Sequence, residues 1–290
     1  MAASGVGDEL QMKSLIHYVP IIAYSILVAL VPITIYSGSA GVFYPAMSEH
    51  FGVPISQITM YQTLGTLLAA FTSLLVGNLL SRYDVRLITS ALAIVDGLSC
   101  IGIACAPNVY TVWFFGALLV ASSVPQLALC NPTLLQRWFK DISGTLIGIA
   151  AAFTGVGGII FVNLGQFLID TMGWQFAYVV FGLIVLLVML PFTIFGIRSY
   201  PADRGMLPYA TSKAGKKEVE AEKKAAHGWS VQVKPAQRSI AFVLVVICGI
   251  SANYAVVIGQ FFPSYANSLI NAGLPIVVAG AGLATILSVA

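Results

Sequence analysis

The sequence is dominated by long apolar runs that contain no Lys, Arg or His. An apolar helix needs about 20 residues to cross the hydrocarbon of a bilayer. The runs lie at 20–46, 58–80, 87–106, 110–136, 144–168, 176–197, 240–264 and 274–290. We therefore expect seven complete membrane spans and an eighth that the sequence cuts short.

The composition agrees with this segmentation. Hydrophobic residues make up 58% of the chain and charged residues only 9%, whereas a soluble domain has about 25% charged residues. So few charges cannot cover a water-facing surface. We expect an all-α integral membrane protein that is surrounded by the lipid bilayer and has no nucleic-acid partner.

The basic residues fall only in alternate loops. They follow spans 2, 4 and 6 or precede span 1: Lys13; Arg82 and Arg86; Arg137 and Lys140; and nine between Arg198 and Arg238. The loops after spans 1, 3, 5 and 7 carry only Glu49, His50 and Asp170 as ionisable groups. Because Lys and Arg accumulate in cytoplasmic loops, we expect a cytoplasmic N-terminus in a multi-pass protein of the cell (inner or plasma) membrane.

The chain divides at its one long polar stretch. Residues 1–197 hold six spans, residues 198–239 form a central cytoplasmic loop, and residues 240–290 start a second group of spans. The loop contains KKEVEAEKK (Lys216–Lys224), whose mixed charges favour a solvated linker over a surface helix. Transporters are often built as two such halves, with the substrate between them.

A short repeat supports two halves. GVFYPAM begins at Gly41 and GQFFPSY at Gly259, 218 residues later, so that span 1 and span 7 would be equivalent. In each copy we expect the glycine to allow close packing and the proline to bend or end the helix. Because two halves of this length exceed 290 residues, we expect a C-terminally truncated chain.

Four passages resemble the major facilitator superfamily, in particular its oxalate/formate-antiporter and monocarboxylate-transporter-like branch. They are YSGSAGVFYPAMSEHFGV (Tyr36–Val53), GNLLSRYDVR (Gly77–Arg86), NPTLLQRWFKDISGTLIGIAAAFTGVGGIIF (Asn131–Phe161), and GWQFAYVVFG (Gly173–Gly182) with its sequel RSYPADRGMLPY (Arg198–Tyr209). The resemblance implies a major facilitator fold with a complete N-terminal six-helix bundle and the start of the second bundle, about 7–8 transmembrane helices in all. It also implies a monomeric secondary transporter of small organic anions.

The second passage is similar to the family's gating-loop motif G-x-L-x-D-R-x-G-R-R. Gly77, Arg82 and Arg86 match it, but Ser81 stands at the acidic position and Asp84 at a glycine position. The gating contacts that the family makes through this loop are therefore in doubt here. In the resembling families the basic residues that pair with the anion lie on helices 8 and 11. No Lys, Arg or His lies in any span predicted here, so the substrate class follows from the resemblance alone.

Polar side chains inside the spans are candidates for a substrate cavity. They fall on spans 1, 2, 4, 5 and 7, which line the cavity in the resembling family, although hydrogen bonds between helices would explain any single one. Our candidates for substrate contact are Tyr36, Gln62, Gln126, Asn131, Tyr254 and Gln260.

Two further features have a structural and a functional explanation. Gly155, Gly157 and Gly158 in span 5 let helices approach closely, which serves packing or gating equally well. Asp96 is the one ionisable group deep in a span, and an intramembrane acid is a functional candidate. It is either a proton-coupling site or a structural hydrogen-bonding group.

The function that these observations favour is secondary transport of a small organic anion, such as formate, oxalate or another mono- or dicarboxylate, by antiport or proton symport with alternating access. A membrane enzyme is disfavoured. An aspartyl protease needs a second intramembrane acid, and His17, His50 and His227 lie outside the spans. We expect no catalytic residue, metal or cofactor. The alternative is a non-transporting remnant or sensor derived from such a transporter.

Overall fold

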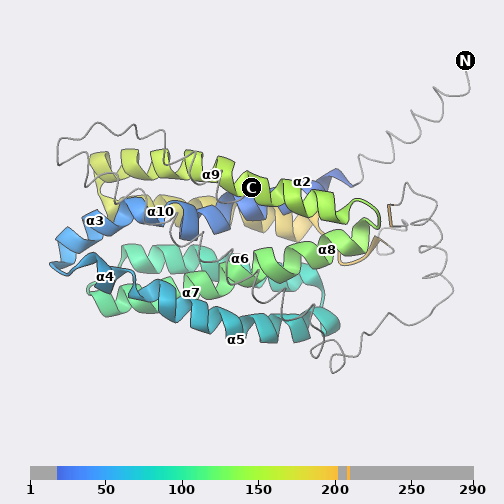
Figure 1. Cartoon of the computed structure of the whole chain (residues 1–290), viewed down its shortest axis with the longest axis horizontal. Helices are drawn as coiled ribbons and strands as arrows, with labels where there is room; N and C mark the ends of the chain where they lie inside the picture. Colours follow the sequence, from blue (N-terminus) through green and yellow to red (C-terminus); the bar gives the residue numbers. More distant parts are fainter. Residues whose placement is uncertain (1–17, 202–207, 210–290) are drawn as a thin grey trace, which may run out of the picture.

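The computed structural model describes residues 18–201 and 208–209, and these form an all-α bundle (Figure 1). Within this part of the chain, six helical stretches are long and apolar enough to cross a membrane. They are Val19–Phe51, Ile55–Arg82, Val85–Ala104, Val109–Trp138, Ser143–Met172 and Trp174–Gly196. The first six predicted spans are confirmed, and the predicted spans at 240–264 and 274–290 lie outside the described residues.

Span 1 is built from three pieces. Helix α2 (Val19–Val28) leads into the π-helix η1 (Ala29–Gly38), and α3 (Ala40–Phe51) follows. Pro32 lies inside η1, where a missing backbone N–H loosens the regular ladder. The sequence predicts that Pro45 either bends the helix or ends it. It does not end the helix, because α3 continues past Pro45 to Phe51. The helix ends at Gly52, whose φ of 63° places it in the left-handed region that glycine adopts without strain.

Span 4 repeats this construction. Helix α7 (Val109–Pro125) changes at its last residue into the π-helix η2 (Gln126–Cys130), and α8 (Asn131–Trp138) completes the span. Pro125 cannot donate a hydrogen bond to the carbonyl of Ala121, four residues earlier. The Thr72 hydroxyl of a neighbouring helix donates to that carbonyl instead, at 2.7 Å. A backbone acceptor freed in the membrane is thus satisfied by a side chain, as lipid requires.

The other four spans are simpler or end in π-helical turns. Span 2 is α4 (Ile55–Ile58) and α5 (Met60–Arg82), span 3 is α6 (Val85–Ala104), and span 5 is α9 (Ser143–Met172). Span 6 consists of α10 (Trp174–Ile184), η3 (Val185–Met189) and η4 (Phe192–Gly196). Gly173, with φ 88°, makes the tight turn between spans 5 and 6.

The helices form two groups that pack against each other. In Figure 1, α9 and α10 lie with α2 and α3 on one side of the bundle, and α5, α6 and α7 occupy the other side. Helix α7 packs along both α5 and α6, α10 packs on α6, and α9 packs along η1. Large apolar side chains that face outward, such as Phe71, Leu74 and Leu187, are more than 60% exposed. An apolar outer surface of this kind suits lipid rather than water.

Polar contacts at the end of the bundle that carries Arg82, Arg86 and Arg137, here called the basic end, hold the chain after span 6. The Ser199 hydroxyl donates to the Asp84 carboxylate and accepts the Val85 backbone N–H at 2.8 Å. The Trp138 indole donates to the Arg198 carbonyl at 2.9 Å. The first residues of the predicted 198–239 loop therefore dock on the bundle.

Spans 1 and 5 meet through glycine. A Cβ atom built on Gly157 would lie 2.5 Å from the Leu30 carbonyl oxygen and 2.4 Å from the Thr34 hydroxyl. A Cβ on Gly38 would lie 3.6 Å from the Gly158 Cα. Gly155, Gly157 and Gly158 are all buried. The close approach of α9 and η1 therefore depends on a missing side chain at Gly157.

We expect Gly157→Ala to lower the free energy of unfolding by about 1–3 kcal/mol, the usual cost of overpacking. The new methyl group would overlap a backbone oxygen of η1, which cannot rotate away. The measurement is unfolding of the purified protein in detergent micelles.

Gly148→Ala on the same helix is the matched control, because nothing lies within 4 Å of a Cβ at that position. Its stability should equal or exceed that of the wild type. Equal stabilities of the two variants would contradict the assigned packing.

Candidate functional site

The carboxylate of Asp96 lies inside the bundle, on the buried face of α6. It is fully buried and accepts three hydrogen bonds from span 4. Ser123 donates to its Oδ1 atom at 2.8 Å, and Ser122 also donates to Oδ1. The Gln126 amide nitrogen donates to Oδ2 at 2.6 Å. The three donors follow each other along α7 and the start of η2, so one carboxylate spans the break at Pro125.

This cluster determines what Gln126 can do. Its nitrogen is used by Asp96, and its Oε1 atom is buried without a partner. The Oδ1 atom of Asn131 is also buried without a partner. Both predicted substrate residues of span 4 thus offer hydrogen-bond acceptors, and both side chains are at most 1% exposed. They lie in the interior of the bundle rather than at its surface.

A second polar group involves spans 1, 2 and 6. The Gln62 amide nitrogen donates to the Tyr44 hydroxyl at 2.6 Å. The Tyr61 hydroxyl interacts with those of Tyr44 and Tyr178, and all three rings are buried. Gln62 itself is only partly buried. The residue therefore connects a buried layer of tyrosines to the surface of the bundle.

Tyr36 interacts electrostatically with a member of each group. These members are Asp96 and Tyr61, and the Tyr36 side chain is partly exposed. It is part of the π-helix η1, which also carries Pro32. π-Helical turns are frequent at functional sites because they interrupt the regular backbone ladder. Tyr36 and Gln62 are the predicted substrate residues that combine a polar neighbourhood with exposure.

The remaining predicted site residues are placed as follows. Gly77 has nothing within 4 Å of a Cβ, Ser81 donates to the Asn78 carbonyl of its own helix, and Arg82 is exposed. Arg86 lies in the first turn of α6, where its backbone N–H is capped by Asp84 at 3.0 Å. Tyr254 and Gln260 lie outside the described residues.

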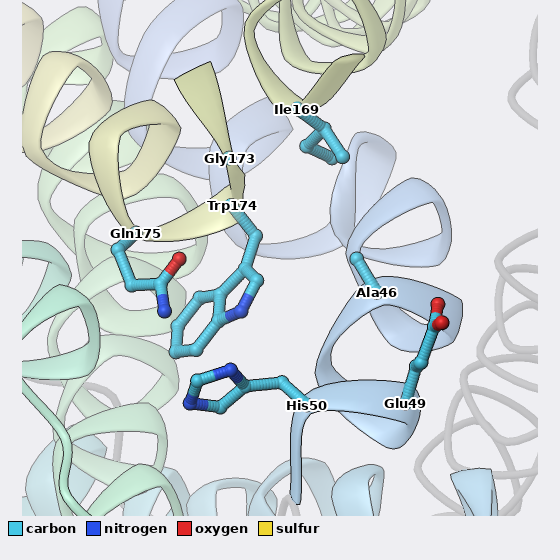
Figure 2. Close-up of a pocket in the computed structure, with 7 residues that line it drawn as sticks. All are labelled: Ala46, Glu49, His50, Ile169, Gly173, Trp174 and Gln175. Atoms are coloured by element: carbon cyan, nitrogen blue, oxygen red, sulfur yellow. The ribbon is translucent and has the colours of Figure 1, made fainter. Parts of the chain in front are cut away.

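The end of the bundle opposite the basic end has an open pocket of about 340 Å³. Figure 2 shows the Trp174 indole beside the His50 ring, with Glu49 directed away from both. The ring centroids of His50 and Trp174 are 5.4 Å apart, and the buried Trp174 indole nitrogen has no hydrogen-bond partner. The lining contains none of the predicted substrate residues. In the described part of the chain, no three His, Cys, Asp or Glu side chains form a group that could hold a metal.

Comparison with known proteins supports the family that the four sequence passages indicate. The Major Facilitator Superfamily sequence model matches residues 26–290, which is most of the chain. The chain belongs to the major facilitator superfamily. Its six described spans are those of a multi-pass membrane protein with the helical fold of this superfamily.

Two curated relatives are transporters by name. The uncharacterized MFS-type transporter YhjX of Escherichia coli (strain K12) is 27% identical over 148 residues, covering 51% of this chain and 37% of the relative. The human MFS-type transporter SLC18B1 is 25% identical over 171 residues, covering 57% of this chain and 37% of the relative. The match thus spans just over a third of the length of each relative. Both relatives are MFS-type transporters by name, and neither name states a substrate.

Sequence reasoning missed three parts of this arrangement. The serine pair before Gln126 could have been paired with Asp96, since one acid and several donors on consecutive spans invite an interhelical network. The Asp84–Ser199 contact carries no sequence signal beyond the departure from the loop motif. The pocket lined by His50 and Trp174 depends on the turn at Gly173, which brings residues of spans 1, 5 and 6 together, and residue types alone could not predict it.

The Asp84 carboxylate gives a specific prediction. Asp84→Ala removes the side-chain cap of α6 and leaves the Ser199 hydroxyl without its acceptor. We expect the free energy of unfolding to fall by about 1–2 kcal/mol, the usual cost of losing a cap. Unfolding in detergent micelles measures it.

Ser81→Ala serves as the control, since this exposed hydroxyl bonds only to its own helix. We expect a change within about 0.5 kcal/mol. If Asp84→Ala were equally harmless, the docking of the chain after span 6 would not depend on Asp84.

Proposed function

We propose that this protein is a secondary active transporter that moves a small organic anion, a mono- or dicarboxylate such as formate or oxalate, by alternating access. Membership of the superfamily carries the transport part of the proposal. The anion class is supported by the four passages that resemble the oxalate/formate-antiporter and monocarboxylate-transporter-like branch. Exchange and proton symport both fit, and the protein acts as a monomer with no enzymatic activity, metal or cofactor.

The proposed substrate site lies on the faces of spans 1 and 2 that keep Tyr36 and Gln62 partly exposed. A phenol hydroxyl and an amide are neutral groups that can orient a carboxylate without binding it irreversibly. Gln126 and Asn131 are proposed to line the site from inside the bundle, and Tyr254 and Gln260 to complete it from the second half.

Alternating access needs helices that slide against each other. The helices α9 and η1 pack through Gly157, which has no side chain to lock the two helices together. We propose that spans 1 and 5 shift against each other at this contact. The π-helical segments η1 and η2 add backbone that can rearrange without breaking a span. In this proposal the gating loop of Gly77, Ser81, Arg82 and Arg86 works with the docked Ser199 rather than with the family's acidic residue.

The protein is placed in the cell membrane with its basic end in the cytoplasm, following the distribution of Lys and Arg. A reporter that is active only outside the cytoplasm should be active when fused after Asn108, between spans 3 and 4. It should be inactive when fused after Asp141, between spans 4 and 5. The reverse pattern would invert the proposed orientation.

Transport is tested with the purified chain in liposomes and labelled formate, oxalate, lactate and pyruvate. We expect uptake or exchange of at least one of them. Gln62→Leu and Tyr36→Phe should each reduce it roughly tenfold, since one hydrogen bond contributes about 1.4 kcal/mol or less.

Asn163→Leu is the matched control, because this amide is exposed and bonds only to the Ile159 carbonyl of its own helix at 2.6 Å. It should leave uptake unchanged. Equal losses in all three variants would contradict the proposed site, and failure of the wild type to move any carboxylate would contradict the anion class.

The alternative is a remnant or sensor that binds without transporting. It is distinguished by measuring binding and transport on the same purified chain. Binding of a labelled carboxylate without uptake or exchange in liposomes would favour the remnant or sensor.

A further inference from the structure

The Asp96 carboxylate poses a problem of charge balance. It is 0% exposed, at mid-depth in span 3, among apolar helices. A lone carboxylate in such a medium is expensive unless it is neutralised or paired. Among the described residues, Lys, Arg and His stand only at or beyond the ends of the spans. No basic side chain of this part of the chain can therefore compensate the charge.

The groups that surround Asp96 are neutral. The tyrosines and cysteines that interact with it electrostatically are Tyr24 of α2, Tyr36 of η1 and Cys100 of α6 itself. Span 4 adds only Ser122, Ser123 and Gln126 as direct partners. Cys130 of η2 is close to Tyr24 and is also neutral as a thiol. The carboxyl group must thus be neutralised by something other than a side chain of the described spans.

Ser122 can bond in two directions, and Ser123 has no such second acceptor in the network. The Ser122 hydroxyl reaches the Asp96 Oδ1 atom and also the Leu118 carbonyl oxygen of its own helix, at 2.7 Å. A hydroxyl has one hydrogen to donate and lone pairs with which to accept. It can therefore give its hydrogen to Leu118 while accepting one from Asp96, or give it to Asp96 instead. Ser123 has only the contact to Oδ1, at 2.8 Å.

We propose that Asp96 holds an exchangeable proton between its Oδ1 atom and the Ser122 hydroxyl, in a short relay that ends on the Leu118 carbonyl. In the protonated form the Asp96 O–H donates to Ser122 Oγ, and Ser122 donates to Leu118. Gln126 continues to donate to the Oδ2 atom, which stays a carbonyl oxygen. Both carboxyl oxygens of Asp96, the Ser122 hydroxyl and the Leu118 carbonyl are then hydrogen-bonded, and the carboxyl group carries no net charge.

Release of the proton is balanced within the same atoms. The O–H bond at Asp96 breaks and the proton passes to water. The Ser122 hydroxyl then rotates from the Leu118 carbonyl to the carboxylate, where Ser123 and Gln126 also donate. Hydrogen bonds to an ionised group are about twice as strong as neutral ones, so three donors stabilise the ionised form. Loss of the proton thus changes how Asp96 is hydrogen-bonded to span 4, close to the break in that span at Pro125.

The consequence for transport, that this proton is the coupling ion, rests on the proposed function, but the site can be tested without transport. The purified chain is titrated in D₂O and followed by infrared spectroscopy. At neutral pH, where exposed Asp and Glu side chains are ionised, the wild type should still show the carbonyl stretch of a protonated carboxylic acid, and raising the pH further should remove it. Asp96→Asn should abolish this band, because an amide can donate to Ser122 and accept from Gln126 as the protonated acid does, but it has no acid group.

The two serines provide the matched pair, and they keep the test valid if Asp96→Asn fails to fold. Ser122→Ala removes the acceptor of the acid hydrogen and should move the band to higher wavenumber. Ser123→Ala should leave the position of the band unchanged. A wild type that shows only carboxylate stretches at neutral pH would overturn the proposal. Persistence of the full acid band in Asp96→Asn, or equal shifts in the two serine variants, would overturn it too.

Discussion

A bilayer offers no hydrogen bonds to the groups that it surrounds, and the fold of this protein follows from that constraint. Irregular backbone in the described spans is compensated by side chains of a neighbouring helix or of the same helix. The carbonyl that Pro125 leaves free accepts a hydrogen bond from Thr72. The Thr34 hydroxyl of η1 donates to the Ala29 carbonyl at 3.1 Å. Asp96 is treated in the same way, with three donors from span 4, but hydrogen bonds alone do not remove its charge.

The course of the chain through the membrane could be predicted well from the sequence. Apolar runs and the absence of charge from them determine where a span is possible, and the alternate basic loops determine how successive spans are connected. Pro45 shows the limit of such reasoning. A proline pattern predicts a disturbed helix, but α3 continues past Pro45 to Phe51 and ends at the left-handed Gly52.

The candidate site was less predictable, since it depends on which way each side chain points. Gln62 and Gln126 look equivalent in the sequence, each an amide in an apolar run. In the assembled bundle Gln62 is partly exposed and donates to the buried Tyr44, while Gln126 is fully buried against Asp96. That difference arises from the rotation of helices against each other, and from the π-helical turn that begins at Gln126. Neither is encoded in a local pattern that residue types alone reveal.

Span 4 connects the middle of the bundle to its basic end. At mid-depth this span is held by Asp96, and at the basic end its Trp138 indole binds the Arg198 carbonyl of the chain after span 6. The central claim is that a proton on Asp96 and the movement of an organic anion are coupled. The most direct test is uptake of a labelled carboxylate by liposomes under an imposed pH gradient, acid outside. Uptake by the wild type should become faster when the pH gradient is applied. Uptake by Asp96→Asn should have the same rate with and without the gradient. Equal acceleration of both proteins would contradict the claim.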